Sequence, residues 1–134
     1  MTAQEISSQP EFSGPAKANN VPGARLIGFE AKDIGDGRAT VTLSAGPQHA
    51  NPVGTLHGGI LCDVADAAMG MAFASTLAPE ESFTTVELKI NFFRPVWQAP
   101  LRAEGTVGHT LARPPPPAIL SGAKRPDSLT TEQF

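Results

Sequence analysis

The sequence predicts an α+β protein in which an antiparallel sheet wraps around one long central helix. Three observations predict this fold: a glycine turn between two strand-like segments, a long apolar helix, and a cleanly alternating strand after that helix. The order is therefore strand, helix, strand, strand. The chain has 134 residues, of which 40% are hydrophobic, and this is enough for one domain with a modest core.

The composition argues against several classes of function. The net charge is −3 and the ten Lys and Arg residues are scattered, so we expect no nucleic-acid partner. Residues 1–9 contain neither a basic start nor an apolar run, so a secretory signal is not expected. The single cysteine, Cys62, has no partner for a disulfide or a cysteine-based metal site, which fits a reducing cytoplasm.

The most apolar stretch runs from Leu56 to Ala78. It is long enough to suggest a transmembrane segment, but it carries His57, Asp63 and Asp66 and lacks a basic flank. Carboxylates are costly inside a bilayer. We therefore predict a core helix and no membrane partner.

The beginning of the chain contains few large hydrophobic residues. Because such a segment cannot offset the entropy of ordering, residues 1–24 are predicted to form a flexible leader. The turn signal Gly35-Asp36-Gly37 and the alternating residues 38–43 then predict a hairpin-like entry into the sheet.

The helix is predicted to begin near His57 or Gly58 and to end near Leu77, before Pro79. Its apolar residues recur at helical spacing, and many of the others are small, so other structure should surround it. Residues 84–93 alternate between apolar and polar and form the strongest predicted strand. A further strand is predicted over residues 101–110.

From Leu111 the character of the sequence changes. Four consecutive prolines, residues 114–117, lack the N–H groups that a central strand needs, and the remaining residues to Phe134 are largely polar. Residues 111–134 are therefore predicted to be a divergent, Pro-rich, disordered tail that adds no strand, which leaves residues 25–110 as an incomplete domain. A reading-frame shift in a GC-rich gene would produce such a change, and an unusual natural tail is the alternative.

The most informative residues surround the start of the helix. Asn51 is followed by His57-Gly58-Gly59, and Asp66 lies about two turns into the helix. Glycines at a helix start leave backbone N–H groups accessible to a developing oxyanion. A carboxylate on the helix can act as a general base for water or as a nucleophile.

Structural interpretations of these residues are also open. The two glycines could form only a turn, and His57 could be a structural histidine that caps the helix. Asp63 competes with Asp66 for the role of base, although the helix dipole alone explains an acidic residue so near the helix start. Thr85 could be an ordinary strand residue.

The motif resembles the hotdog-fold acyl-CoA thioesterase superfamily, in particular the phenylacetate-degradation (PaaI-like) type. The segment from Val86 to Pro95 is also similar, so the resemblance covers about residues 25–110. It implies a hotdog fold with a catalytic centre in which Asp66 is the base or nucleophile and Gly58 supplies the oxyanion N–H. Asn51 and His57 would orient the water or the thioester. The partner chain of a dimer would add a hydroxyl group, matched by Thr85 and less well by Thr84.

The resemblance implies hydrolysis of an aryl or medium-chain acyl-CoA to the free acid and coenzyme A. Coenzyme A is then part of the substrate, and neither a metal nor a redox cofactor is expected. The protein would be cytoplasmic and would assemble as a homodimer or a dimer of dimers. The alternatives are a non-catalytic acyl-CoA-binding module, against which Asp66 argues, a hydratase of the same fold, and an inactive truncated or frameshifted copy.

Overall fold

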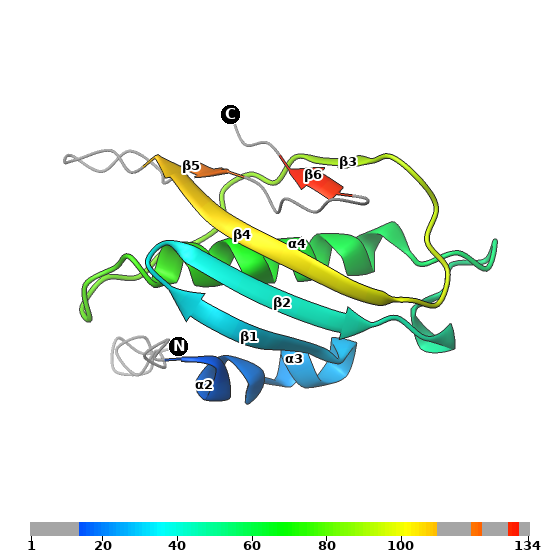
Figure 1. The fold of residues 1–134 in the computed structure, drawn as a ribbon, viewed down its shortest axis with the longest axis horizontal. Coiled ribbons are helices and arrows are strands. Elements are labelled where there is room, and N and C mark those ends of the chain that lie inside the picture. Colours follow the sequence, from blue (N-terminus) through cyan, green and yellow to red (C-terminus); the bar gives the residue numbers. More distant parts are fainter. Residues whose placement is uncertain (1–13, 110–118, 122–128, 132–134) are drawn as a thin grey trace.

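The computed structural model describes residues 14–109 in full, together with the backbone of residues 119–121 and 129–131. In chain order the elements are α2 (Pro15–Asn19), α3 (Pro22–Ile27), β1 (Phe29–Gly35), β2 (Arg38–Ser44), a 3-10 turn (Pro47–His49), α4 (Gly58–Ala74), β3 (Ile90–Phe92), β4 (Pro100–His109), β5 (Ile119–Ser121) and β6 (Leu129–Thr131). Figure 1 shows the helix α4 lying along one face of the strands β1, β2 and β4.

The main sheet has four strands in the order β1-β2-β4-β5, and β3 pairs separately with β6. All of these pairs are antiparallel. The predicted α+β architecture, an antiparallel sheet around one long helix, is therefore confirmed. Among the described residues, no helix is both long and apolar enough to cross a bilayer.

The core lies between α4 and the inner face of the sheet. Alternate residues of β2 and β4 point inward, and the helix presents mostly small side chains to them. The buried residues of this layer include Ala39, Val41, Leu43, Val64, Ala65, Ala68, Ala72, Leu101 and Ala103. Small helix residues bring the helix backbone close to the sheet.

The predicted hairpin is confirmed and its turn is tied to the rest of the domain. Asp36 and Gly37 both have positive φ, 51° and 72°, which is the geometry of a two-residue type I′ turn. The Gly37 N–H donates to the Ser75 hydroxyl at 2.8 Å, and the Gly37 carbonyl accepts from the Val107 N–H at 2.9 Å. The turn therefore joins the end of α4 to strand β4.

The helix begins at Gly58, as predicted, but ends at Ala74 rather than near Leu77. Two hydroxyl groups follow its last turn. Ser75 donates to the Ala72 carbonyl and Thr76 donates to the Phe73 carbonyl, each at 2.7 Å. Such side-chain bonds take the acceptors that a continuing helix would use, which explains the earlier end.

The prediction of a flexible leader is wrong for residues 14–24. This part forms α2 and the start of α3, each with a proline in its first turn. Ala18 is buried, and the Asn19 side chain accepts from the Ala31 N–H at 2.6 Å and donates to the Ala31 carbonyl at 3.0 Å. A small residue and one amide thus hold the segment against the outer edge of β1 without any large hydrophobic side chain. Residues 1–13 lie outside the described part.

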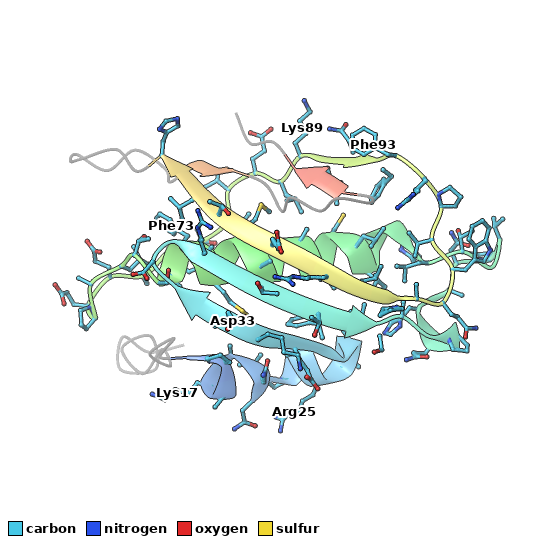
Figure 2. All side chains as sticks on the ribbon, in the orientation of Figure 1. Lys17, Arg25, Asp33, Phe73, Lys89 and Phe93 are labelled. Carbon is cyan, nitrogen blue, oxygen red and sulfur yellow. The ribbon has the colours of Figure 1, made fainter. Side chains whose placement is uncertain are left out.

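The strand predicted over residues 84–93 is much shorter in the structure. Only Ile90–Phe92 is a strand, paired with β6. Alternation predicts which side chains share a face, but a strand also needs a partner for its backbone hydrogen bonds. Several apolar side chains of this segment are exposed, including Val86 at 76% and Phe93 at 67%. Figure 2 shows Lys89 and Phe93 pointing outward along this edge of the molecule.

The predicted strand over residues 101–110 corresponds to β4, which ends at His109. The prediction that the tail adds no strand is wrong, because β5 pairs with β4 and β6 pairs with β3. The β-branched Ile and Thr favour strands, and short segments that contain them can pair even when prolines lie nearby in the sequence. The proline run and the other residues predicted to be disordered lie outside the described part of the tail.

Helix α4 lies directly against β4 at Gly105. A Cβ atom at this position would lie 2.2 Å from the Ala68 carbonyl oxygen and 2.9 Å from the Met69 backbone nitrogen. Both neighbours belong to the helix backbone, which cannot rotate away as a side chain could. No residue larger than glycine fits here without displacing the helix.

We predict that Gly105→Ala lowers the free energy of unfolding by about 3 kcal/mol, because the added methyl group forces the helix and the strand apart. Gly35→Ala is the matched control, since a Cβ at Gly35 would meet no atom within 4 Å. Urea denaturation followed by circular dichroism measures both. Equal stabilities of the two variants would contradict the close crossing.

Candidate active site

Asp66 and Thr85 form the central contact of the candidate site. The Thr85 hydroxyl donates to Oδ1 of Asp66 at 2.9 Å, and both residues are half-buried. Asp66 lies in α4, and Thr85 lies in the segment between α4 and β3. Thr85 therefore bonds Asp66 within its own chain, and the expectation that a partner chain adds the Thr85 hydroxyl to the site stays a prediction.

The two carboxylates near the helix start differ in their surroundings. Asp63 is exposed, whereas Asp66 is half-buried and has one oxygen held by Thr85. A held carboxylate with a second oxygen available is better placed to act on a reactant than a solvated one. The structure thus favours Asp66 over Asp63 as the candidate base or nucleophile.

His57 occupies the position immediately before the helix. Its Nδ1 accepts a hydrogen bond from the Gly59 N–H at 2.9 Å, which is the geometry of an N-terminal cap. The capping role that the sequence left open is therefore present. It does not prevent a second role, because an Nδ1 that accepts places the proton of the neutral ring on Nε2, where the ring can donate.

Gly58 supplies the first backbone N–H of α4. Within the described part of the chain this N–H has no hydrogen-bond acceptor, as expected for a donor in the first turn of a helix. The Phe92 ring lies over the glycine, since a Cβ at Gly58 would be 3.1 Å from the ring edge. Gly58 can therefore present a donor close to an aromatic wall, a suitable setting for a developing oxyanion.

The Asn51 side chain folds back on its own loop. Its Oδ1 accepts from the N–H groups of Val53 and Thr55 at 3.0 and 3.1 Å, and its Nδ2 donates to the Thr55 hydroxyl at 2.8 Å. These bonds close the loop that leads to His57. In the structure Asn51 shapes the loop, and the predicted role in orienting a reactant stays a prediction.

The five predicted site residues fall into two groups. Asn51, His57 and Gly58 lie at the start of α4, and Asp66 lies with Thr85. From Gly58 to Asp66 the helix advances about 12 Å, at 1.5 Å per residue. Within one chain, the Gly58 donor and the Asp66 carboxylate therefore do not meet on the same carbonyl group.

Burial raises the pKa of the half-buried Cys62 thiol, and the nearby Asp63 and Asp66 carboxylates raise it further. Cys62 is therefore a protonated thiol at neutral pH and not a nucleophile. Among the described residues, no group of three His, Cys, Asp or Glu side chains is arranged to hold a metal ion.

Sequence reasoning missed His49, which is buried with an exposed fraction of 5%. Both of its ring nitrogens are hydrogen-bonded, one to Gly46 and the other to Ile27. It is the last residue of the 3-10 turn, two positions before Asn51, where neither spacing nor residue type distinguishes it. Only the three-dimensional contacts reveal its importance.

Residues 53–112 match the model of the thioesterase superfamily. Two curated relatives, both named as esterases, are 38% identical over the matched regions. One is from Saccharolobus solfataricus and aligns over 62% of this chain and 59% of its own length. The other is from Pseudomonas aeruginosa and aligns over 50% of this chain and 51% of its own length. The match thus spans somewhat more than half of the length of these relatives.

Solved structures share the fold over most of the chain. A conserved protein of Pseudomonas aeruginosa superimposes with a TM-score of 0.72 at 28% identity, covering 87% of this chain and 91% of that one. The PaaI protein of the phenylacetic acid degradation operon of Escherichia coli superimposes with a TM-score of 0.70 at 23% identity, covering 87% and 85% of the two chains. The resemblance to the hotdog-fold thioesterase superfamily, which the motif indicated, is therefore confirmed in sequence by the family match and in fold by the solved structures.

Proposed function

We propose that this protein hydrolyses an acyl-CoA thioester, with an aryl or medium-chain acyl group, to the free acid and coenzyme A. The observation that carries the proposal is the hydrogen bond from the Thr85 hydroxyl to the Asp66 carboxylate on α4. This bond occupies one oxygen of Asp66, and in the proposal the other oxygen acts on the reactant. The match to the thioesterase superfamily supports a thioester as the bond that is cleaved.

In the proposed reaction Asp66 takes a proton from water while the water oxygen attacks the thioester carbonyl carbon. The negative charge that develops on the carbonyl oxygen is stabilised by the Gly58 N–H and by the positive end of the helix. The C–S bond then breaks, and the proton passes to the thiolate of coenzyme A. In the nucleophilic version Asp66 itself attacks the carbonyl carbon, and water hydrolyses the resulting anhydride.

The separation along α4 supports a site that is shared between two chains. Because Gly58 and Asp66 lie about 12 Å apart on one rigid helix, we propose that each site combines groups from two copies. Asn51, His57 and Gly58 come from one copy, and Asp66 with its Thr85 comes from the other. The protein is then a homodimer or a dimer of dimers, with two equal sites in each symmetric pair.

The proposed reaction needs no metal or redox cofactor, because the carboxylate, the backbone donor and water supply all of its steps. His57 and Asn51 are proposed to orient the thioester or the water at the helix start. We propose the cytoplasm as the location, on the same argument from the single Cys62 as above.

We predict that Asp66→Asn lowers thiol release from acyl-CoA substrates by about a hundredfold or more, because an amide cannot accept the proton or attack the carbonyl. Asp63→Asn is the matched control, one turn away on the same helix, and should stay near the wild-type rate. Thiol release is followed with a chromogenic thiol reagent across a panel of aryl and medium-chain acyl-CoAs. The opposite ranking of the two variants would transfer the role to Asp63. Acyl-CoA binding without thiol release by the wild-type protein would instead identify a binding module.

We also predict that the active species is at least a dimer and that its sites are shared between chains. Asn51→Ala and Asp66→Asn, each weakly active alone, are mixed, unfolded and refolded together. Random pairing should restore about a quarter of the wild-type rate, because half of the dimers are mixed and each of these has one intact site. Size-exclusion chromatography with light scattering gives the assembly state. An active monomer, or a mixture that gains nothing over its components, would contradict the shared site.

A further inference from the structure

His49 is the buried polar side chain of residues 14–109, and it anchors the loop that leads into α4. Its Nδ1 accepts from the Gly46 N–H at 3.0 Å, and its Nε2 lies 2.7 Å from the Ile27 carbonyl oxygen. Ile27 is the last residue of α3, so the ring connects this loop to an element far away in the sequence.

The two contacts determine which ring nitrogen carries the proton. A backbone N–H can only donate, so the Nδ1 that faces Gly46 must be unprotonated. A carbonyl can only accept, so the Nε2 that faces Ile27 must carry the proton. Both bonds exist together only in the neutral Nε2–H form of His49. The imidazole therefore connects the Gly46 backbone to the Ile27 backbone in one fixed orientation.

The backbone of His49 continues the link to the candidate site. Its carbonyl oxygen accepts from the His57 N–H at 2.8 Å, at the residue that caps α4. The loop between them is closed by the bridge between Ala50 and Leu56, and the Leu56 N–H donates to the Val96 carbonyl at 2.6 Å. The position of the helix start thus depends on the peptide of His49, and the imidazole holds that peptide in place.

We infer that His49 is a positioning residue for the oxyanion end of the site. It does not touch the reacting atoms, but it fixes the loop that carries Asn51 and places His57 and Gly58 at the start of α4. Displacing a catalytic donor by about 1 Å can lower the reaction rate about a hundredfold. A residue such as His49, which holds the loop in place, can therefore affect the rate without touching the substrate. This catalytic consequence rests on the proposed function.

The test separates the two ends of the link. His49→Asn keeps an acceptor at the position of Nδ1, and His49→Gln keeps a donor at the position of Nε2, so each variant retains one of the two bonds. His109→Gln is the matched control, because His109 is exposed at the end of β4. Amide hydrogen exchange by NMR reports on the loop whether or not the protein is an enzyme.

We expect the His57 amide to exchange about tenfold faster in both His49 variants, the gain that follows when a hydrogen bond is weakened. The Gly46 amide should lose protection only in His49→Gln. The amides of Val41 and Ala103 in the sheet should not change. Unchanged exchange at His57 in both variants, or equal acceleration in the loop and the sheet, would overturn the inference.

The kinetic arm uses the same three variants. We expect kcat for thioester hydrolysis to fall about tenfold or more in His49→Asn and His49→Gln, with KM changed by less than about threefold, because the oxyanion donor acts mainly in the transition state. A rise in KM with unchanged kcat would overturn the positioning role. If the wild-type protein cleaves no thioester, the proposed function fails, and the exchange measurement still decides whether His49 holds the loop.

Discussion

The close approach of helix α4 to strand β4 is the constraint on which the rest of the structure depends. Gly105 leaves no space between the strand and the helix backbone at Ala68, and the neighbouring turns carry the fully buried small residues Ala65 and Ala72. At this distance the helix can neither rotate nor slide without a backbone clash. The rotation of α4 about its axis is thereby set, and so are the directions of its polar side chains.

That rotation places Asp66 on the same stripe of the helix as Met69 and Phe73. Met69 and Phe73 form a second apolar cluster, and the partly buried Phe83 and Leu88 pack against it. The rings of Phe73 and Phe83 meet edge to face, with centroids 5.4 Å apart and an interplanar angle of 80°. The apolar contact holds the segment after the helix beside α4, and Thr85 in that segment then reaches Asp66. Apolar packing, rather than local sequence, thus brings Thr85 and Asp66 together.

The elements that were predicted correctly are those whose cause lies within a few residues. Gly37 permits a type I′ turn by its own conformational freedom, and Gly58 begins a helix because a cap precedes it. Apart from the end of α4, where the local bonds of Ser75 and Thr76 decide, the errors concern residues whose structure depends on distant partners. Asn19 is ordered by Ala31, and the strand assignment of residues 84–93 depends on which backbone lies next to them. Periodicity cannot reveal such partners.

The same distinction holds within the candidate site. The order of Asn51, His57, Gly58 and Asp66 in the sequence indicated the class of chemistry, because each residue type is suited to a step of thioester hydrolysis. The pairing of Thr85 with Asp66 and the anchoring role of His49 did not follow from it. Both depend on contacts across many residues of sequence, 19 for Asp66 with Thr85 and 22 for His49 with Ile27.

The placement of both halves of the proposed machinery on one helix has a geometric consequence. A helix does not bend to bring its first turn to its third, so the separation of Gly58 and Asp66 is as fixed as the helix itself. Two helices that run in opposite directions and overlap only along their first halves bring the start of each next to the middle of the other. A two-fold axis produces this arrangement twice, and one rigid helix per chain then completes two equal sites. On the proposed function, the pairing of chains is therefore part of how the site is built. The rigid helix that keeps Gly58 and Asp66 apart within one chain also sets the distance between Gly58 of one chain and Asp66 of the other.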